Sequence, residues 1–112
     1  MFKGHPKLNT DRKQRLVMRI GKLSNMVYIG HLDLLNVYER ALRRAAIPVA
    51  MDSSPFHARA RIKTALPLPL GASSLAEIME VELTRRMDPE EFRRKFAEQL
   101  PEELPILSVS HP

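Results

Sequence analysis

Hydrophobic and polar residues alternate along several short segments of the chain, as they do in strands that bury one face. The clearest alternation covers residues 16–20 and 78–83, and a third alternating segment covers residues 61–66. Residues 106–109 form a last short apolar run, and residues 27–29 are rich in strand-favouring side chains. The pattern therefore predicts four strands and one further β-rich segment.

A helical pattern covers about residues 32–46. The apolar positions that recur there at helical spacing and share one face are Leu34, Leu35, Tyr38, Ala41, Leu42 and Ala45. Asp33 lies in the first turn, and Arg43 and Arg44 lie in the last, where each charge interacts favourably with the helix dipole. Pro48 is expected to end the helix.

A second helix is expected to begin after Asp88. Asp88 is a favourable N-cap residue, Pro89 follows at the first helical position, and Glu91 is placed to close a capping box. The residues expected on its buried face are Phe92, Phe96 and Leu100. Pro101 is expected to stop this helix.

The predicted order of elements is strand, helix, strand, strand, helix, strand, with loops at residues 21–26 and 52–59 and an irregular Pro-rich connection at 67–71. Two helices, each between strands, indicate an α+β fold of the ferredoxin-like split βαβ type. We expect an antiparallel sheet with two helices on one face and the other face open. The charged side chains expected on the open face are Arg19, Arg61, Lys63, Glu80 and Glu82.

The chain has 112 residues and a mass of 12.8 kDa, enough for one hydrophobic core. Residues 1–14 show no periodicity, so we expect a flexible basic tail followed by a single α+β domain at residues 15–112. No apolar run approaches the roughly 20 residues of a membrane span, and no secretory signal is recognised, so a cytoplasmic protein without membrane contact is expected. The lack of cysteine excludes disulfides, thiolate zinc sites, iron–sulfur clusters and a cysteine nucleophile.

Positive charge is concentrated in the first part of the chain. Residues 1–70 carry 13 basic and 4 acidic side chains, whereas residues 71–112 carry 5 and 9, within a net charge of +5. A basic side of this kind attracts polyanions, so RNA is the partner that the charge pattern favours. With no Trp, two Tyr and four Phe, a base-stacking platform for single strands is hard to build.

Two groups of basic side chains are the candidate nucleic-acid contacts. The first group, on the predicted helix, is Arg40, Arg43 and Arg44, and the second, in the loop at 52–59 and the strand after it, is His57, Arg59, Arg61 and Lys63. We expect folding to bring both groups onto one surface that contacts a sugar–phosphate backbone. Ordinary ion pairs are the alternative, with Glu39 pairing with Arg43 and the acidic residues of segment 78–83 neutralising the second group.

His31 and Asp33 begin the first predicted helix, directly after Gly30. A histidine in this position could bind phosphate or act as a general base, because it titrates near neutral pH. The alternative is that both residues only cap the helix. The four histidines have no ligand-like spacing and no phosphate-binding glycine loop is present, so no metal and no cofactor is expected.

Three segments resemble a known bacterial family: GHLDLLNVYERALRRAAIPVA at residues 30–50, ARIKTALPLPLGASS at residues 60–74, and EIMEVELT at residues 77–84. The family is the radical-SAM-linked domain of unknown function, which lies beside or is fused to cobalamin-binding radical SAM proteins. The chain departs from the family pattern at Gly30, where the family has serine, and in the loop at 53–60, which lacks the family's glycine and asparagine. The resemblance implies an accessory role beside a radical SAM protein, which would itself hold the cluster.

These observations favour a non-catalytic module that binds RNA, or presents a substrate, in association with a radical SAM protein. Phosphate contacts are expected from the two basic groups, with His31 nearby. Two alternatives stay open. One is a protein-interaction module that docks on the radical SAM partner through the open sheet face, and the other is a metal-independent RNA endonuclease with His31 as general base. We rank binding first, interaction second and catalysis third.

Overall fold

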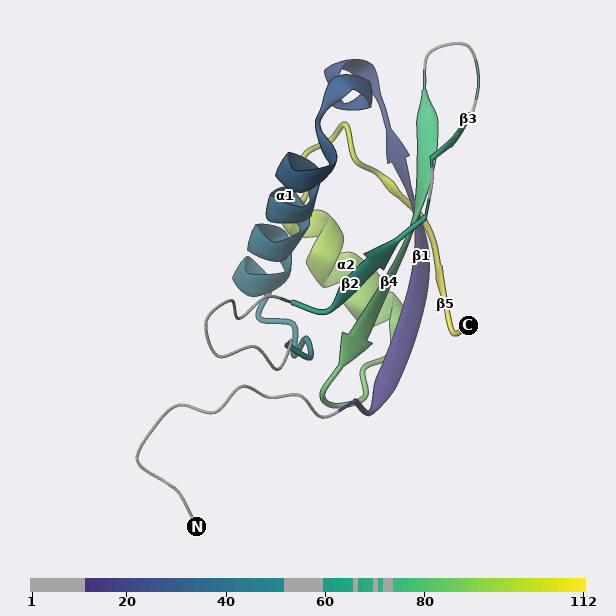
Figure 1. The fold of residues 1–112 in the computed structure, drawn as a ribbon. Coiled ribbons are helices and arrows are strands. Elements are labelled where there is room, and N and C mark those ends of the chain that lie inside the picture. Colours follow the sequence, from purple (N-terminus) through teal and green to yellow (C-terminus); the bar gives the residue numbers. More distant parts are fainter. Residues whose placement is uncertain (1–11, 52–59, 66, 70, 72–73) are drawn as a thin grey trace.

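The computed structural model describes residues 12–51, 60–65, 67–69, 71 and 74–112 (Figure 1). Its elements, in chain order, are β1 (Gln14–Lys22), the short 3-10 helix η1 (Ser24–Tyr28), α1 (His31–Arg44), β2 (Ile62–Thr64), β3 (Leu68–Pro69), β4 (Leu75–Leu83), α2 (Pro89–Gln99) and β5 (Ile106–Ser110). Most of the predicted tail lies outside the described residues, and Gln14, its predicted last residue, already belongs to β1. The predicted order of strands and helices is confirmed.

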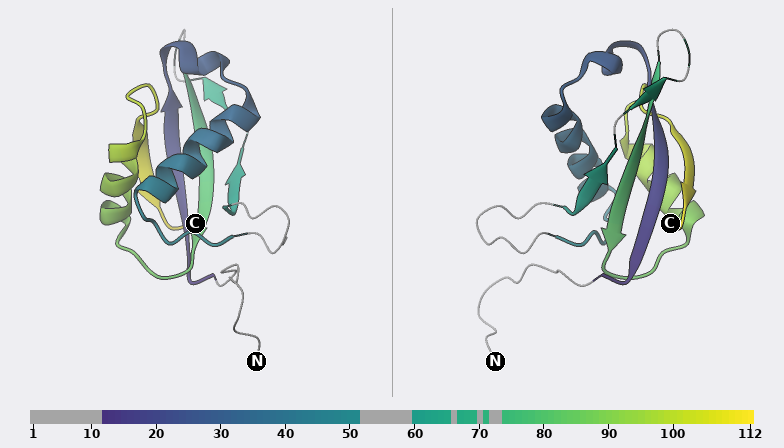
Figure 2. Two further views of the ribbon diagram at one scale, coloured as in Figure 1. Left: turned by 90° about the vertical axis from the view of Figure 1, so that its left-hand side faces the viewer. Right: turned by 45° about the vertical axis from the view of Figure 1, so that its right-hand side comes forward.

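The strands form one antiparallel sheet in the order β2–β4–β1–β5, and β3 pairs with the beginning of β4. Both helices lie on the same face of this sheet (Figures 1 and 2). Each helix connects two strands that have one other strand between them: α1 joins β1 to β2 across β4, and α2 joins β4 to β5 across β1. The protein therefore has the expected α+β architecture, consistent with a ferredoxin-like split βαβ arrangement.

The core lies between the sheet and the two helices. The alternating residues of the two central strands that are fully buried there are Leu16, Met18, Ile20, Met79, Val81 and Leu83. Tyr38 of α1 packs edge-on against Phe96 of α2 with the ring centroids 6.3 Å apart, and Phe92 lies 5.5 Å from Phe96. The predicted apolar faces of both helices are therefore the faces that cover the sheet.

The end of α1 is set by a residue with left-handed backbone geometry. Ala46 has a φ of 56°, its N–H bonds to the carbonyl of Arg43 at 3.0 Å, and the N–H of Ile47 bonds to the carbonyl of Leu42 at 3.1 Å. This pair of bonds is the Schellman arrangement, in which glycine is the usual left-handed residue. The helix ends two residues before the predicted position 46, because Ala46 already turns the chain back onto the last helical turn.

α2 begins at Pro89 as predicted, but the predicted capping box is wrong. Asp88 precedes the helix with an extended backbone, and among the described residues no side chain makes a capping hydrogen bond there. The carboxylate of Glu91 lies instead 3.6 Å from the amino group of Lys95, one turn further along α2. Of the predicted start signals, the helix retains proline at the first helical position, and Glu90 and Glu91 lie in its first turn, where they interact favourably with the helix dipole.

The segment between β1 and α1 differs from the prediction. Residues 27–29 do not form a strand, and η1 covers residues up to Tyr28. Ser24 enters this helix with a left-handed φ of 53°. β4 begins at Leu75, directly opposite Lys22, so the chain beyond Lys22 has no neighbouring part of β4 to pair with. Local strand propensity is therefore overridden by the lack of a partner strand.

The two strands on the far side of β4 are short. β2 covers three residues, Ile62–Thr64, within the predicted range 61–66. The Pro-rich segment 67–71 is predicted from the sequence to be irregular, yet Leu68–Pro69 pairs antiparallel with the first residues of β4. Proline is tolerated there because β3 pairs with β4 alone, and an edge strand needs no outward N–H donor.

Candidate functional site

Arg40, Arg43 and Arg44 lie exposed on the outer side of α1, whose opposite side is buried against the sheet. We call them the α1 arginines. Arg40 and Arg44 are four residues apart and are therefore neighbours on the helix surface. In the part of the chain that the structure describes, none of the three side chains has a hydrogen bond or ion pair. The alternative Glu39–Arg43 pair is wrong: Glu39 accepts a hydrogen bond from the backbone N–H of Ala60 at 3.5 Å.

Glu80 and Glu82, the acidic side chains of β4 that are out of phase with its apolar core residues, pair with arginines from β1 and the segment before it. Lys63 lies opposite Glu80 in the strand register, but Glu80 Oε2 is 3.6 Å from the Nε of Arg15 on β1. Glu82 Oε2 is 3.0 Å from the Nε of Arg12. Glu82 is only 2% exposed, so the prediction that it is an exposed residue of the open face is wrong.

The α1 arginines and Lys63 do not share a surface. Lys63 and Glu80 are out of phase with the buried residues of the sheet, so Lys63 points away from the face that α1 covers. Arg61 is half-buried just before β2. His57 and Arg59 lie outside the described residues. The single basic surface expected from the sequence is therefore not formed by the α1 arginines and Lys63.

His31 is the first residue of α1, at the opposite end from Arg43 and Arg44. At a rise of about 1.5 Å per residue, roughly 18 Å of helix separates His31 from Arg43. The interpretation of His31 and Asp33 as capping side chains is wrong, because Gly30 is the N-cap residue and no side chain among the described residues bonds there. The His31 side chain instead lines a cavity.

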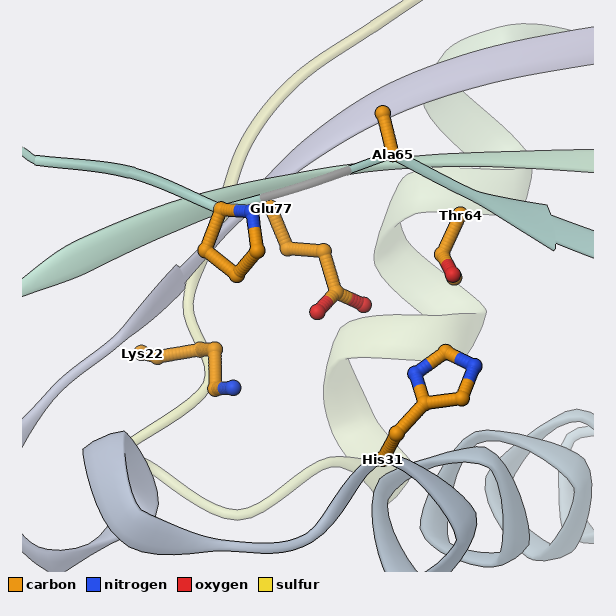
Figure 3. A pocket seen from close by; sticks show the side chains of 6 residues that line it. Lys22, His31, Thr64, Ala65 and Glu77 are labelled. Atoms are coloured by element: carbon orange, nitrogen blue, oxygen red, sulfur yellow. The ribbon is translucent and has the colours of Figure 1, made fainter.

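This cavity, with a volume of about 430 Å³, opens between the start of α1 and the sheet (Figure 3). The residues that line it are Lys22, His31, Thr64, Ala65, Pro67 and Glu77. They come from the ends of β1 and β2, the start of α1, the segment after β2 and the first part of β4. Lys22, His31 and Glu77 point toward one another into the cavity. Residues far apart in the sequence are therefore brought together by the fold.

Glu77 brings a buried carboxylate to the cavity. It lies on the core face of β4 and is 2% exposed, and its Oε1 accepts a hydrogen bond from the hydroxyl of Tyr38 on α1 at 3.4 Å. Burial raises the pKa of Glu77 above its ordinary value, although the charges of Lys22 and His31 and the Tyr38 hydrogen bond act in the opposite direction. Burial, the Glu77 charge and the same hydrogen bond raise the pKa of Tyr38.

Lys22 is the second buried charge of the cavity, with 5% of its surface exposed. Glu77 lies opposite Ile20 in the register, so Lys22 is its diagonal neighbour on the same face of the sheet. The sequence prediction of the site omits both residues. Each is a charged residue in the buried phase of a strand, and this break in the apolar alternation is the signal that could have identified them.

Two searches of the described residues, for a metal-ligand cluster and for a membrane-spanning helix, found neither. No group of three or more His, Cys, Asp or Glu among them could hold a metal ion. The ammonium of Lys22 beside His31 and Glu77 would also repel a cation in the cavity. None of the helices that the structure describes has the length and apolar character needed to cross a membrane.

The fold and its polar side chains define a small α+β domain with a charged cavity at the start of its first helix and an arginine-rich outer helix face. Residues 15–112 match the model of a family described as "Uncharacterized protein conserved in bacteria (DUF2344)", and the chain belongs to that family. No curated protein and no solved structure matches the chain.

Proposed function

We propose that this protein is a non-catalytic RNA-binding accessory module that contacts phosphates through the α1 arginines. The observation that supports the proposal is the exposure of these three side chains on one helix, without a carboxylate partner among the described residues. A guanidinium group binds phosphate oxygens in a bidentate manner, and bound phosphates would relieve the repulsion between Arg40 and Arg44. Because Lys63 and His31 lie elsewhere, the proposed contact is limited to the outer face of α1.

The proposed partner is a radical SAM protein to which the module presents RNA. This part of the proposal rests on the resemblance of residues 30–50, 60–74 and 77–84 to the radical-SAM-linked domain. The chain has no cysteine, so the iron–sulfur cluster would belong to the partner. Co-purification of the two chains that is lost after nuclease treatment supports presentation through RNA. Co-purification that resists nuclease supports the alternative of direct protein docking.

The salt dependence of RNA binding tests the role of the α1 arginines. For single strands, the logarithm of the association constant falls with the logarithm of the salt concentration, with a slope of about 0.7 per neutralised phosphate. The variant Arg40→Ala/Arg44→Ala is expected to bind more weakly and to reduce that slope by about 1.4. Fluorescence anisotropy with a labelled RNA over a series of salt concentrations measures both quantities.

A matched control removes two exposed arginines from elsewhere on the molecule. Arg86 follows β4 and Arg94 lies on α2, and both are exposed. The variant Arg86→Ala/Arg94→Ala lowers the net charge equally and is expected to keep the slope of the wild type. If the two double variants lose RNA affinity and salt slope equally, the protein attracts RNA through its net charge alone. Unchanged binding in Arg40→Ala/Arg44→Ala would contradict the proposal.

The position of His31 favours a second candidate, a metal-independent RNA endonuclease. His31 shares the cavity with Glu77 and Lys22, which would supply a second titratable group and a positive charge beside a general base. Single-turnover incubation of labelled RNA with the protein in EDTA detects such cleavage, and His31→Ala should abolish it. If the RNA stays intact, the endonuclease hypothesis is contradicted and the RNA-binding module is the function that still applies.

A further inference from the structure

The face of the sheet that points away from the helices has no helix over it. Both α1 and α2 lie on the opposite face (Figures 1 and 2). Side chains that are out of phase with the buried residues of the strands point to the uncovered face. The ones at its centre that are exposed or half-buried are Arg15, Val17, Arg19, Lys63, Ile78 and Glu80. We call the surface that these six residues form the open sheet face.

The open sheet face has an excess of positive charge. The side chain of Glu80 is 22% exposed and pairs with Arg15, with 3.6 Å between Oε2 and Nε. Arg19 and Lys63 are exposed, and the described residues give neither side chain a hydrogen bond or an ion pair. Two unpaired cations therefore remain after the carboxylate is neutralised, and they favour an acidic partner surface.

Two half-buried apolar side chains lie beside these cations. Lys63, Glu80 and Val17 form one row across β2, β4 and β1. Arg19 lies two residues beyond Val17 and is opposite Ile78. With about 4.8 Å between strands and about 3.3 Å per residue, the Cα atoms of Lys63 and Arg19 are about 12 Å apart. Apolar side chains next to charged ones are typical of protein interfaces, which have an apolar centre and a polar rim.

The composition of the strands favours a protein over RNA as the partner of this face. Open sheets that bind single-stranded RNA stack the bases on aromatic side chains. The strands that the structure describes contain no Phe, Tyr or Trp. Val17 and Ile78 can instead contact apolar side chains of a protein. The open sheet face therefore suits a protein surface that combines carboxylates with an apolar side chain.

We propose that the open sheet face docks an acidic amphipathic helix of a partner protein. Carboxylates of that helix pair with Arg19 and Lys63, and an apolar side chain between them covers Val17. A helix is the element that usually covers a sheet face in α+β folds. Helix residues seven positions apart share one face and are separated by about 10.5 Å, close to the separation of about 12 Å between the two cations.

The α1 arginines are on the other side of the molecule from the open sheet face. They lie on the outer side of α1, whose inner side covers the opposite face of the sheet. The two surfaces can therefore be occupied at the same time, one by RNA and the other by a protein. The docking proposal does not depend on the proposed RNA contact, because the two surfaces share no residue.

Nuclear magnetic resonance titration with a synthetic peptide tests the proposal. The probe is an alanine-rich helical peptide in which one leucine has a glutamate four residues before it and another three residues after it, so that all three share one face. The peptide is expected to shift the backbone amide signals of β1, β2 and β4 and to leave those of α1 unchanged. Single-stranded RNA is expected to shift the signals of α1 and to leave those of the strands unchanged.

Charge reversal examines the role of the two unpaired cations. Arg19→Glu/Lys63→Glu is expected to weaken peptide binding at least about tenfold, because like charges then face each other. A peptide with lysine in place of both glutamates is expected to bind this variant and not the wild type. Arg40→Glu/Arg44→Glu changes the net charge equally and is the matched control. It should bind the acidic peptide like the wild type and should lose RNA binding.

Circular dichroism establishes that each variant is folded. Arg19→Ala/Lys63→Ala introduces no new charge beside Glu80, so it keeps the test decisive if the reversed variant does not fold. It should also weaken peptide binding. Peptide shifts confined to α1, or equal peptide binding by the wild type and Arg19→Ala/Lys63→Ala, would overturn the proposal. RNA that shifts the signals of the strands would overturn it as well, because the open sheet face would then be a nucleic-acid surface.

Discussion

The hydroxyl of Tyr38 donates a hydrogen bond to Oε1 of Glu77 at 3.4 Å, and this bond joins the buried side of α1 to the core face of β4. Both side chains are almost completely removed from solvent, with exposures of 0% and 2%. The bond stabilises a carboxylate that burial alone would disfavour. The cavity's carboxylate therefore depends on the same aromatic residue that packs against Phe96 between the two helices.

Tyr38→Phe is expected to lower the free energy of unfolding by about 1 kcal/mol, because it removes one hydrogen bond from the buried Glu77 carboxylate and keeps the ring. It should also raise the pKa of Glu77 further, since this hydrogen bond favours the ionised form. Urea denaturation measures the stability. Tyr28→Phe is the matched control. Tyr28 is 85% exposed, so this substitution should change the free energy of unfolding by less than about 0.5 kcal/mol. Equal effects of the two substitutions would contradict a role for the Tyr38 hydroxyl.

The raised pKa of Glu77 predicts a pH-dependent stability. The folded protein holds the Glu77 proton more tightly than the unfolded chain, so this residue makes the protein less stable as the pH rises from 4.5, its ordinary value, through the folded pKa. Glu77→Gln removes this loss, so the stability of the variant relative to the wild type should increase with pH across that window. Urea denaturation at a series of pH values measures the difference.

Glu98→Gln, at an exposed position of α2, is the control for this series and should follow the wild type. A relative stability of Glu77→Gln that stays constant or falls with rising pH would show that the carboxylate is not destabilised by burial.

Lys22→Met is expected to lower the free energy of unfolding by about 1 kcal/mol, because it removes a positive charge that favours the ionised form of the buried Glu77 carboxylate. It should also raise the pKa of Glu77 further. Thermal unfolding measures the stability. Lys63→Met, at an exposed position of β2, should change stability by less than about 0.5 kcal/mol. A Lys22→Met protein as stable as the wild type would contradict this role of the Lys22 charge.

Ala46→Gly is expected to stabilise the protein by about 0.5–1 kcal/mol, because alanine at a φ of 56° is strained and glycine is not. Ala45→Gly, one residue earlier, should destabilise the protein by a similar amount, because Ala45 has the ordinary helical φ of −79°. Urea denaturation of both variants measures this opposite response. The same sign of change at both positions would contradict the assigned Schellman ending.

Much of the fold follows from local hydrophobic patterns that can be recognised in the sequence. Leu16, Met18 and Ile20 are buried as their alternation predicts, and the apolar stripes of both helices cover the sheet. The predictions from the sequence are wrong where the conformation of a segment depends on whether a neighbouring strand is present to pair with it. Residues 27–29 have strand propensity but no neighbouring strand, and Leu68–Pro69 forms a strand because β4 extends far enough to pair with it.

The candidate site follows the same division. The exposure of the α1 arginines is predictable, because they occupy the polar side of an amphipathic helix. The separation of these arginines from Lys63 is not, because it depends on which face of the sheet the helices cover. Lys22 and Glu77 are two of many charged residues in the sequence. They stand out only because both are buried on the core face of two paired strands.

The sequence by itself determined the class of fold, the apolar faces of the central strands and helices, and the exposure of the α1 arginines, because periods of two and of 3.6 residues depend on neighbours along the chain. The tertiary structure alone decided that Lys22, His31 and Glu77 meet in one cavity and that Tyr38 reaches the carboxylate. These contacts depend on strand order, on register and on the position of α1 over the sheet, which are set by long-range packing rather than by any local pattern.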